Sequence, residues 1–401
     1  MYATYRNNFV RKIMQSGVYE FSNMDRIIFG RAAKEAITET AAKLGKSRLM
    51  IVASKTLNRQ TSTISEIKIA LGEQCVGVFD ECVEHAPRAS VLALVARIKK
   101  LEPDLIVTIG GGSPMDTVKV SLTCIAENVT DLSGFDRIRI SLAPDGKRIV
   151  PDVKDPPLRQ IIVPTTLSGA EFSSVAGATD PVRKVKDIYS AKMVGGQVLI
   201  LDPAITIHTS EKLWLSTGIR AIDHAVESIC SHRPQPFVDA NCLHALGMLS
   251  RSLRAVKKNP EDLDARLECQ LGVWLASTGI GQIDWGASHG IGHQLGAVAG
   301  VLHGHCSCVM LPSVLRYNKG INSERQTMIA RAMGQPSKSA ADAVAELIAD
   351  LEQPGNLRAV GVTRDHFNAI ATGAMQNFHV RANPRPISST KDIIEILEMA
   401  Y

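Results

Sequence analysis

The sequence predicts an α/β domain with a parallel sheet, followed by an all-helical domain. Three observations lead to this prediction. A chain of 401 residues is long for a single hydrophobic core. Its first half alternates short apolar runs with helical stretches, whereas no strand-like run follows Pro203. We therefore expect domains at 1–203 and 204–401, with a ligand site in the cleft between them.

Six apolar runs in the first half are the expected strands. The run LIVTIG is nearly continuous in apolar residues, which is typical of a strand covered on both faces and hence of a parallel sheet. The expected strands are 27–29, 49–53, 76–79, 105–110, 161–164 and 198–202. The polar, proline-rich stretch 131–158 is expected to form a hairpin or a surface loop.

The second half contains segments with the periodicity of amphipathic helices. These segments are 210–232, 239–257, 261–281, 322–333, 338–352 and 389–400. The sequence shows no internal repeat at solenoid periods and no low-complexity segment.

Composition excludes several classes of function. The formal net charge is +5, without a run of basic residues, so nothing predicts binding to nucleic acid. The eight cysteines include no CxxC pair, which favours a reduced, cytoplasmic protein. No apolar run approaches the roughly 18 residues that a membrane span needs. A small molecule is therefore the expected partner.

A glycine-rich turn in DLIVTIGGGSPMDTVK predicts an anion site. Gly110, Gly111 and Gly112 let backbone N–H groups approach a ligand closely. Ser113 suits a helix N-cap and Pro114 the first helical position, so the helix would direct its positive end at a diphosphate. Asp116 would cap the helix or reach the bound group. The spacing matches neither the dinucleotide nor the P-loop fingerprint, so a tight turn without a ligand stays open.

The loop VPTTLSGAEFSS at 163–174 also follows an expected strand and is rich in hydroxyl groups. Thr165, Thr166 and Ser168 could bind a ribose or a carboxamide. An ordinary Ser/Thr turn is the alternative.

Histidines in the second half form a candidate metal or catalytic site. His289 and His293 share a helix face, as do Arg220 and His224, because residues i and i+4 project together. His303 follows a glycine-containing stretch that can turn back toward them. The pair His289 and His293 is not a metalloprotease motif, because the required glutamate is absent. Satisfied core histidines are the alternative to a shared site.

Together, these motifs resemble the iron-containing alcohol dehydrogenase superfamily over roughly residues 25–400. The resemblance rests on GGGSPMDTVK, PTT with a following Gly and Glu171, G-x-x-A-x-x-H-A-x-E at 218–227, the H-x3-H-x9-H series with LPSVLRYN, and NPRP at 383–386. It implies an NAD(P)-dependent oxidoreductase with a Rossmann-like N-terminal domain and a helical C-terminal domain, the architecture shared with dehydroquinate synthase. It also implies a homodimer or larger homo-oligomer. Lyases related to dehydroquinate synthase lack the complete histidine and NPRP pattern.

The resemblance assigns the family's metal ligands to an aspartate at the position of Arg220 and to His224, His289 and His303. His293 corresponds to a histidine near the nicotinamide, a candidate for proton transfer. A guanidinium has no lone pair for a metal, and at about 4 Å it would repel a divalent cation by several kcal/mol. We therefore expect no tightly bound Fe²⁺ or Zn²⁺.

Two details of the sequence resemble the maleylacetate reductase branch of this superfamily. The resemblance implies that this branch works without a metal ion. The loop PTTLSGAE is one residue shorter than the usual family loop, and FDECVEHAP at 79–87 is similar to a stretch of those reductases.

Ser54, followed by Lys55 and Arg59, stands where many members carry an aspartate that repels a 2′-phosphate. NADPH should therefore be tolerated or preferred over NADH.

The leading hypothesis is an NAD(P)H-dependent reductase acting on a small carbonyl or enone substrate that bears a carboxylate. Arg220 would stabilise the developing oxyanion or clamp the carboxylate, and His293, with an ordinary pKa near 6.5, would supply or remove the proton. His224, His289 and His303 would become hydrogen-bonding neighbours. The alternatives are a metal-dependent alcohol or hydroxy-acid dehydrogenase, and a dinucleotide-binding protein that has lost catalysis. In the last case Arg220 would form a structural ion pair with Asp223 or Glu227.

Overall fold

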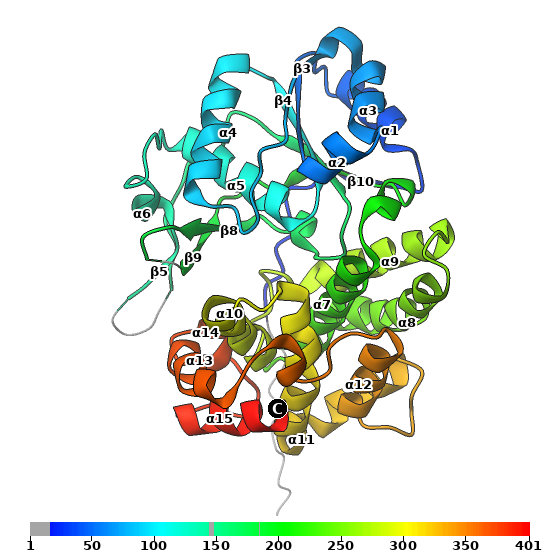
Figure 1. Ribbon diagram of the computed structural model, residues 1–401, viewed down its shortest axis with the longest axis vertical. Helices are drawn as coiled ribbons and strands as arrows, with labels where there is room; N and C mark the ends of the chain where they lie inside the picture. The colour runs from blue at the N-terminus through cyan, green and yellow to red at the C-terminus, as the bar shows by residue number, and fades with distance from the viewer. Residues whose placement is uncertain (1–16, 144–147, 184) are drawn as a thin grey trace, which may run out of the picture.

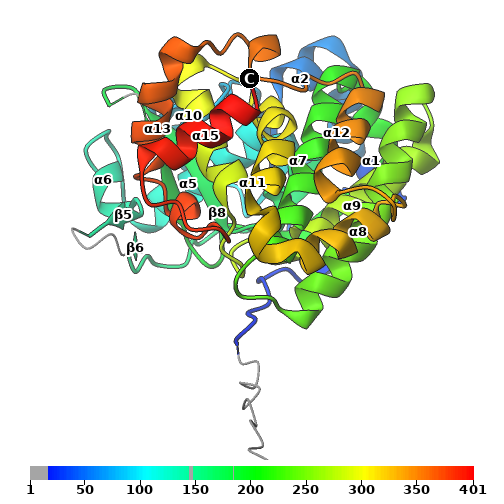
Figure 2. The same cartoon turned by 90° about the horizontal axis from the view of Figure 1, so that it is seen from below.

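The computed structural model describes residues 17–143, 148–183 and 185–401. A sheet with helices on both faces forms one part of the molecule, and a group of helices forms the other (Figure 1). The view from below shows the helical part in front, with α7 and α11 near its centre (Figure 2). The fold is that of an α/β part followed in sequence by a helical part, as predicted.

The main sheet has six parallel strands in the order β1-β10-β7-β4-β2-β3. The strands are β1 Arg26–Phe29, β2 Leu49–Ala53, β3 Cys75–Phe79, β4 Leu105–Gly110, β7 Gln160–Pro164 and β10 Gly196–Leu201. Every residue of β2, β4 and β7 is buried, which explains their continuous apolar runs. The six predicted strands are confirmed, with ends that differ by one or two residues.

Alternate residues of each strand enter two different cores. Leu49 and Ile51 of β2 pack on the side covered by α1 Ala33–Lys43 and α3 Thr63–Leu71. Met50 and Val52 pack on the side covered by α4 Arg88–Leu101 and α5 Gly112–Ala126. The period of two along a strand thus places apolar side chains against helices on both faces. A further helix, α2 Lys55–Gln60, follows β2 directly.

Two antiparallel hairpins extend the α/β part. The strands β8 Val175–Asp180 and β9 Val185–Ser190 pair with each other, and so do β5 Ser141–Leu142 and β6 Arg148–Ile149. The second pair, together with α6 Phe135–Ile138, lies in the stretch predicted to be a hairpin or loop. The first pair was not predicted, because VAGATD and VKDIYS carry polar residues and lack a continuous apolar run.

The part of the chain described after Leu201 contains helices and no strands. The helices are α7 Glu211–Cys230, α8 Pro236–Lys258, α9 Leu263–Ala276, α10 Ala287–Ala299, α11 His303–Ala332, α12 Ala340–Asp350, α13 Phe367–Ala374, α14 Phe378–Arg381 and α15 Thr390–Met399. Short 3₁₀ turns are η1 Gly72–Gln74, η2 Ala170–Phe172, η3 Ala204–His208, η4 Ser277–Gly279, η5 Arg358–Val360 and η6 Arg364–His366. No helix among the described residues is long and apolar enough to cross a membrane.

The predicted helices agree with α7, α8, α9, the end of α11, α12 and α15. The start of α11 was missed, because its residues are buried on every side and include Pro312, so they show no amphipathic period. Cys306 and Cys308 lie in this stretch as buried thiols, and burial raises the pKa of Cys306 to about 12. Helix α7 lies at the centre of the helical part, packed against α8 and α11, and is buried along most of its length.

The start of α5 differs from the prediction. The helix begins at Gly112 with Gly111 as its N-cap, so Ser113 and Pro114 lie within its first turn. Ser113 makes no capping hydrogen bond. The reason is that Gly110, with φ of 154°, turns the chain immediately after β4, in a conformation that side chains rarely adopt. The helix therefore starts earlier, closer to the end of the sheet.

Candidate active site

Three segments predicted to bind a cofactor meet at the carboxyl ends of β2, β4 and β7. The Thr165 N–H donates to the Gly110 carbonyl over 3.0 Å, and the Ser54 N–H donates to the Ile109 carbonyl over 3.1 Å. A methyl group at Gly111 would lie 2.9 Å from Thr166 Cγ2, so only glycine allows this approach. In a parallel sheet this edge is where ligands bind, and the N-terminus of α5, whose first-turn N–H groups have no partner within the helix, lies there. The glycine turn fits the diphosphate of a dinucleotide.

The remaining predicted cofactor residues border this turn. Thr166 Oγ1 donates to Ser168 Oγ over 3.3 Å, and Ser54 caps α2 by accepting from the Leu57 N–H. Asp116 does not cap α5; it forms an ion pair with Lys186 of β9 at 2.9 Å.

Lys119 ties the hydroxyl-rich loop to α5, a role that sequence reasoning missed. Its Nζ donates to the Ala170 carbonyl over 2.6 Å and to the Val175 carbonyl over 3.3 Å. Burial lowers the pKa of Lys119 to about 8 and raises the pKa of neighbouring Glu171 to about 7. A lysine inside the buried stretch VKVSL was the available signal, because an isolated buried lysine normally needs partners.

The same loop contacts the central helix of the helical part. The Leu167 N–H donates to Thr217 Oγ1 of α7 over 3.1 Å. One turn further along α7 is Arg220, and a methyl group at Gly169 would lie 3.2 Å from His224. The loop thus joins the glycine turn to the helix that carries Arg220 and His224.

The predicted histidines lie within one aromatic cluster, which also includes Trp285 and His379. His224 stacks on Trp285 with ring centroids 4.6 Å apart, and Trp285 stacks on His289 at 4.1 Å. His293 stacks on His303 at 5.7 Å, and His379 lies 5.8 Å from His293. Neither Trp285 nor His379 was predicted, because neither belongs to a spaced motif.

Gly290 lets α14 pack closely on α10. A methyl group there would lie 2.5 Å from Val380 Cγ2 and 2.9 Å from the Val380 nitrogen. This close approach explains the glycine at the position where a metalloprotease has its glutamate. It brings α14, with His379, against the face of α10 that carries His289 and His293.

Glu227 holds the start of α10. Its carboxylate accepts from the N–H groups of Gly286 at 3.0 Å and Ser288 at 2.9 Å, and it lies 2.7 Å from His289 Nδ1. Burial raises the pKa of Glu227 to about 7, and the backbone N–H groups oppose that rise. Burial lowers the pKa of His289 well below its usual value, so the contact is a hydrogen bond that the neutral ring donates from Nδ1 to the Glu227 carboxylate. His289 Nε2 is left without a partner among the described residues.

Asp223 is a second buried carboxyl group beside His289, with its Oδ2 3.6 Å from His289 Nδ1. Its Oδ2 accepts from Ser307 Oγ at 2.7 Å and from Ser288 Oγ at 2.9 Å. Burial raises the pKa of Asp223 well above its usual value, and neighbouring Glu227 adds to the rise.

Arg220 makes no hydrogen bond or ion pair with any residue that the structure describes. The ion pair with Asp223 or Glu227, considered as an alternative, is therefore not formed. Arg220 is half-buried, and burial lowers its pKa, although Asp223 opposes that change. Its charge is the largest cause of the lowered pKa of His303 and also lowers the pKa of His224 and His289. Holding a half-buried guanidinium without a partner costs free energy, because the charge loses water. A bound anion would offset that cost.

His293 is neutral at neutral pH. Burial, and then the charge of Arg220, lowers its pKa to about 3. This corrects the expectation that a pKa near 6.5 would let His293 both supply and remove a proton. Asn377 lies 3.1 Å from His293 Nδ1.

Comparisons with known proteins agree on one family. Residues 25–203 match the family described as iron-containing alcohol dehydrogenase, and residues 214–401 match the C-terminal domain of the same family. A dehydrogenase of Gibberella moniliformis is 32% identical, covering 93% of this chain and 95% of that protein. The chain belongs to the iron-containing alcohol dehydrogenase family. It is therefore an NAD(P)-dependent oxidoreductase.

The family members similar to this chain include maleylacetate reductases, the branch that the loop PTTLSGAE resembles. A maleylacetate reductase of Sphingobium indicum is 27% identical, covering 94% of this chain and 95% of that protein. The solved structure of the maleylacetate reductase of Agrobacterium tumefaciens has the same fold, with a TM-score of 0.81 and 23% identity over 97% of this chain and 99% of that one. The resemblance to this branch is confirmed.

The side chains at the family's metal positions do not bring a set of ligand atoms together in this structure. Within the described residues, His224, His289 and His303 do not bring three ligand atoms within 4.8 Å of one another, and Arg220 adds a positive charge. Asp223, Glu227 and His289 do lie that close. However, this second set is engaged in hydrogen bonds, including one of 2.7 Å between two of its own members. Those contacts form a network that orients α10.

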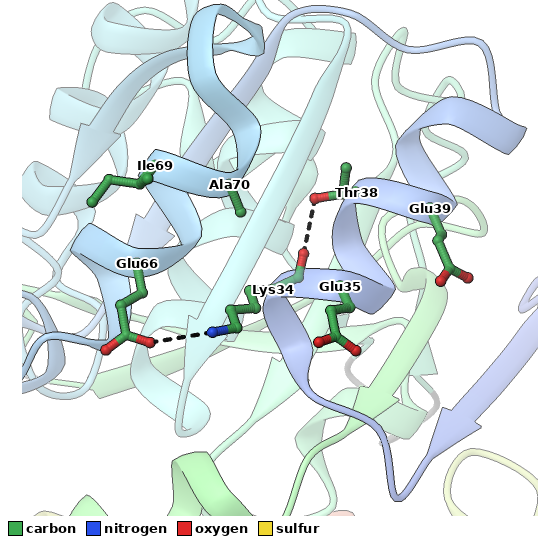
Figure 3. A pocket seen from close by; sticks show the side chains of 7 residues that line it. All are labelled: Lys34, Glu35, Thr38, Glu39, Glu66, Ile69 and Ala70. Carbon is green, nitrogen blue, oxygen red and sulfur yellow. Dashed lines mark hydrogen bonds and ion pairs between the residues drawn. The ribbon is translucent and has the colours of Figure 1, made fainter.

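A shallow hollow on the α/β part lies elsewhere. It is bordered by α1 and α3, with Lys34, Glu35, Glu66 and Ile69 on its rim (Figure 3). An ion pair of 3.7 Å joins Lys34 to Glu66 across it. The hollow is open to solvent and shares no residue with the glycine turn or the histidine cluster, so we place the active site at the latter two.

Proposed function

We propose that this family member reduces a small carbonyl or enone substrate that bears a carboxylate, using NAD(P)H and no metal ion, as a maleylacetate reductase-like enzyme. One observation carries the proposal: Arg220 replaces the ligand aspartate and has no partner among the described residues. The maleylacetate reductases among the relatives support this substrate class.

The dinucleotide would bind along the end of the sheet. Gly110, Gly111, Gly112 and Ser113 would hold the diphosphate, while Thr165, Thr166 and Ser168 would hydrogen-bond the ribose or carboxamide. When bound, NAD(P)H supplies the hydride.

We also propose that NADPH is accepted, and is preferred if Lys55 reaches the 2′-phosphate. Ser54 puts no negative charge after β2, and Lys55 is exposed. Arg59 contributes less than the sequence indicated, because it pairs with Asp80 at 2.7 Å.

The chemistry would depend on Arg220 and His293. Reduction adds a hydride to carbon and a proton to oxygen, so negative charge develops on that oxygen. The Arg220 guanidinium would stabilise this charge or hold the carboxylate through two parallel hydrogen bonds. Neutral His293 would donate a hydrogen bond to the same oxygen, and the proton that this oxygen gains would come from water, directly or through His293. His224, His289 and His303 would surround the substrate.

Organisation and assembly follow as further parts of the proposal. Residues 1–203 and 204–401 would be two domains, with the active site between them, and the protein would act in the cytoplasm as a homodimer or larger homo-oligomer. The exposed side chains of Phe21 and Phe237, whose rings contact each other, support burial by another subunit. Sedimentation of the purified protein measures the oligomer.

The proposal is tested by metal content and activity on one preparation. We expect less than stoichiometric zinc and iron, with NADH or NADPH oxidised in the presence of maleylacetate. One equivalent of tightly held metal would overturn the metal-free reaction. Bound nucleotide without oxidation by maleylacetate or simple aldehydes would instead favour a protein that has lost catalysis.

Arg220→Asp restores the family's ligand set in the same chain. We expect it to gain affinity for Zn²⁺ or Fe²⁺ under anaerobic conditions, measured by calorimetry, because the repulsive charge becomes a ligand. If the variant binds no more metal than the wild type, the spacing of the three histidines, and not the charge of Arg220, is what excludes the ion.

A further inference from the structure

Asn377 connects the short helix α14 to His293. Its side-chain oxygen Oδ1 accepts from the backbone N–H of His379 over 3.0 Å, which caps α14. Because a backbone N–H can only donate, this contact identifies the oxygen of the amide. The other side-chain atom is therefore the amide nitrogen, Nδ2, and it lies 3.1 Å from Nδ1 of His293.

The direction of this second hydrogen bond is set by chemistry. An amide nitrogen donates and does not accept, so His293 Nδ1 must be the acceptor and carry no proton. In a neutral imidazole the proton is then on Nε2. His293 Nε2 makes no hydrogen bond with the described residues, so its N–H is available to a ligand.

The surrounding packing holds this arrangement. Gly290 allows α14 to approach α10, and Val380 of α14 fills the space where a side chain at Gly290 would lie. The His293 ring is stacked on His303 and lies edge-on to His379. A ring flip of His293 would place a carbon atom opposite the Asn377 amide and lose the hydrogen bond.

We propose that Asn377 is a positioning residue that keeps His293 in the tautomer with its proton on Nε2, the atom that donates to the substrate oxygen. The donation to substrate rests on the proposed function; the tautomer does not. The reduction needs a donor at the oxygen whose charge increases, and a histidine in the other tautomer would present a lone pair there. Asn377 thus acts on the reaction only through His293.

Asn377→Asp separates this role from helix capping. A carboxylate oxygen still accepts from the His379 N–H, so α14 keeps its cap, but the group facing His293 changes from donor to acceptor. His293 should then carry its proton on Nδ1. The tautomer is read from ¹⁵N chemical shifts of the histidine-labelled full chain at neutral pH without ligand, with His293 assigned by its absence in His293→Gln.

In the wild type we expect an unprotonated Nδ1 and a protonated Nε2, and in Asn377→Asp the reverse. The same tautomer in both proteins would overturn the proposal. Asn377→Ala is the second variant, in which the cap and the donor are both lost. It should lower the unfolding temperature and populate both tautomers, and a single Nε2–H tautomer in that variant would also overturn the proposal.

Steady-state kinetics then test the donor role. In Asn377→Asp, kcat with maleylacetate and NADH should fall roughly 100-fold, with the nucleotide KM changed less than about threefold, since the loss concerns only the transition state. A reversed tautomer with unchanged kcat would support the positioning by Asn377 and overturn the donor role of His293. The two hypotheses therefore fail separately.

Discussion

The two regions of the active site are built differently. The nucleotide region at the ends of β2, β4 and β7 is mostly backbone: a glycine turn, a helix N-terminus and two loops joined by main-chain hydrogen bonds. The histidine region is made of side chains from α7, α10, α11 and α14. In the proposed site, binding of an anion would depend on local chain geometry, whereas the chemistry would depend on contacts between segments far apart in sequence.

The two regions also differ in the source of their positive charge. In the nucleotide region the partial charge of the α5 N-terminus would face the diphosphate, and that charge cannot be removed by substitution. In the histidine region the positive charge is that of Arg220, a single side chain without a partner among the described residues. The histidine region should therefore be far more sensitive to one substitution.

Arg220→Gln should have the largest effect. Removing the charge that stabilises the oxyanion should lower kcat by about 100- to 1,000-fold, with little change in the nucleotide Kd. Arg316→Gln, which removes an exposed arginine paired with Asp342, is the matched control and should leave both constants unchanged. Equal loss of kcat and nucleotide affinity in Arg220→Gln would mean that the two regions are not separable.

Each region contains a buried carboxyl group, and Glu171→Gln tests the one beside the nucleotide loop. The folded pKa of about 7 lies above the ordinary value of 4.5, so the group stabilises the fold below about pH 4.5. That contribution, up to about 3 kcal/mol, is lost as the pH rises to about 7. Urea unfolding at pH 5 and pH 7 should show a smaller loss of stability in Glu171→Gln than in the wild type. An identical loss would place the pH dependence elsewhere, with Glu227 as the next group to test.

Gly290→Ala perturbs only the packing of the histidine region. The added methyl group would force α14 away from α10, at a cost of about 1–3 kcal/mol in the free energy of unfolding. Gly320→Ala in α11 is the control, because a methyl group there meets nothing within 4 Å, and it should be neutral or slightly stabilising. The thermal unfolding midpoints of both variants test this expectation. Equal midpoints would mean that α10 and α14 are not closely packed.

Ser54→Asp should have the smallest effect, confined to the nucleotide region. A carboxylate after β2 should weaken NADPH about tenfold through repulsion of the 2′-phosphate and leave NADH nearly unchanged. Fluorescence titration with both nucleotides measures this. An equal change for both would show that residue 54 does not face the 2′ position.

Much of the fold could be predicted because its signals are local. The continuous apolar runs of β2, β4 and β7 are direct consequences of burial on both faces. The β8–β9 hairpin and the start of α11 were missed for opposite reasons. The hairpin strands VAGATD and VKDIYS carry polar residues and have no continuous apolar run, and the start of α11 is buried on every side and has no amphipathic period.

The candidate site was predictable only in part. The glycine turn, Arg220 and the histidines of α7 and α10 stand in recognisable spacings. Asn377 and His379 follow no motif, although they contact His293 from 84 and 86 residues away along the chain. Such contacts depend on the close packing of α14 at Gly290, which spacing does not reveal.

The sequence by itself determined the parallel sheet and the glycine-rich turn at 110–112, because both are encoded in consecutive residues. It also predicted, from the spacing of the family motif, that Arg220 replaces a ligand aspartate. Only the tertiary structure decided that Arg220 lacks an ion-pair partner in the described chain, that burial lowers the pKa of His293 and that the Asn377 amide lies against His293 Nδ1. Charge pairing, burial and hydrogen-bond direction are properties of side chains brought together by folding, and no local pattern encodes them.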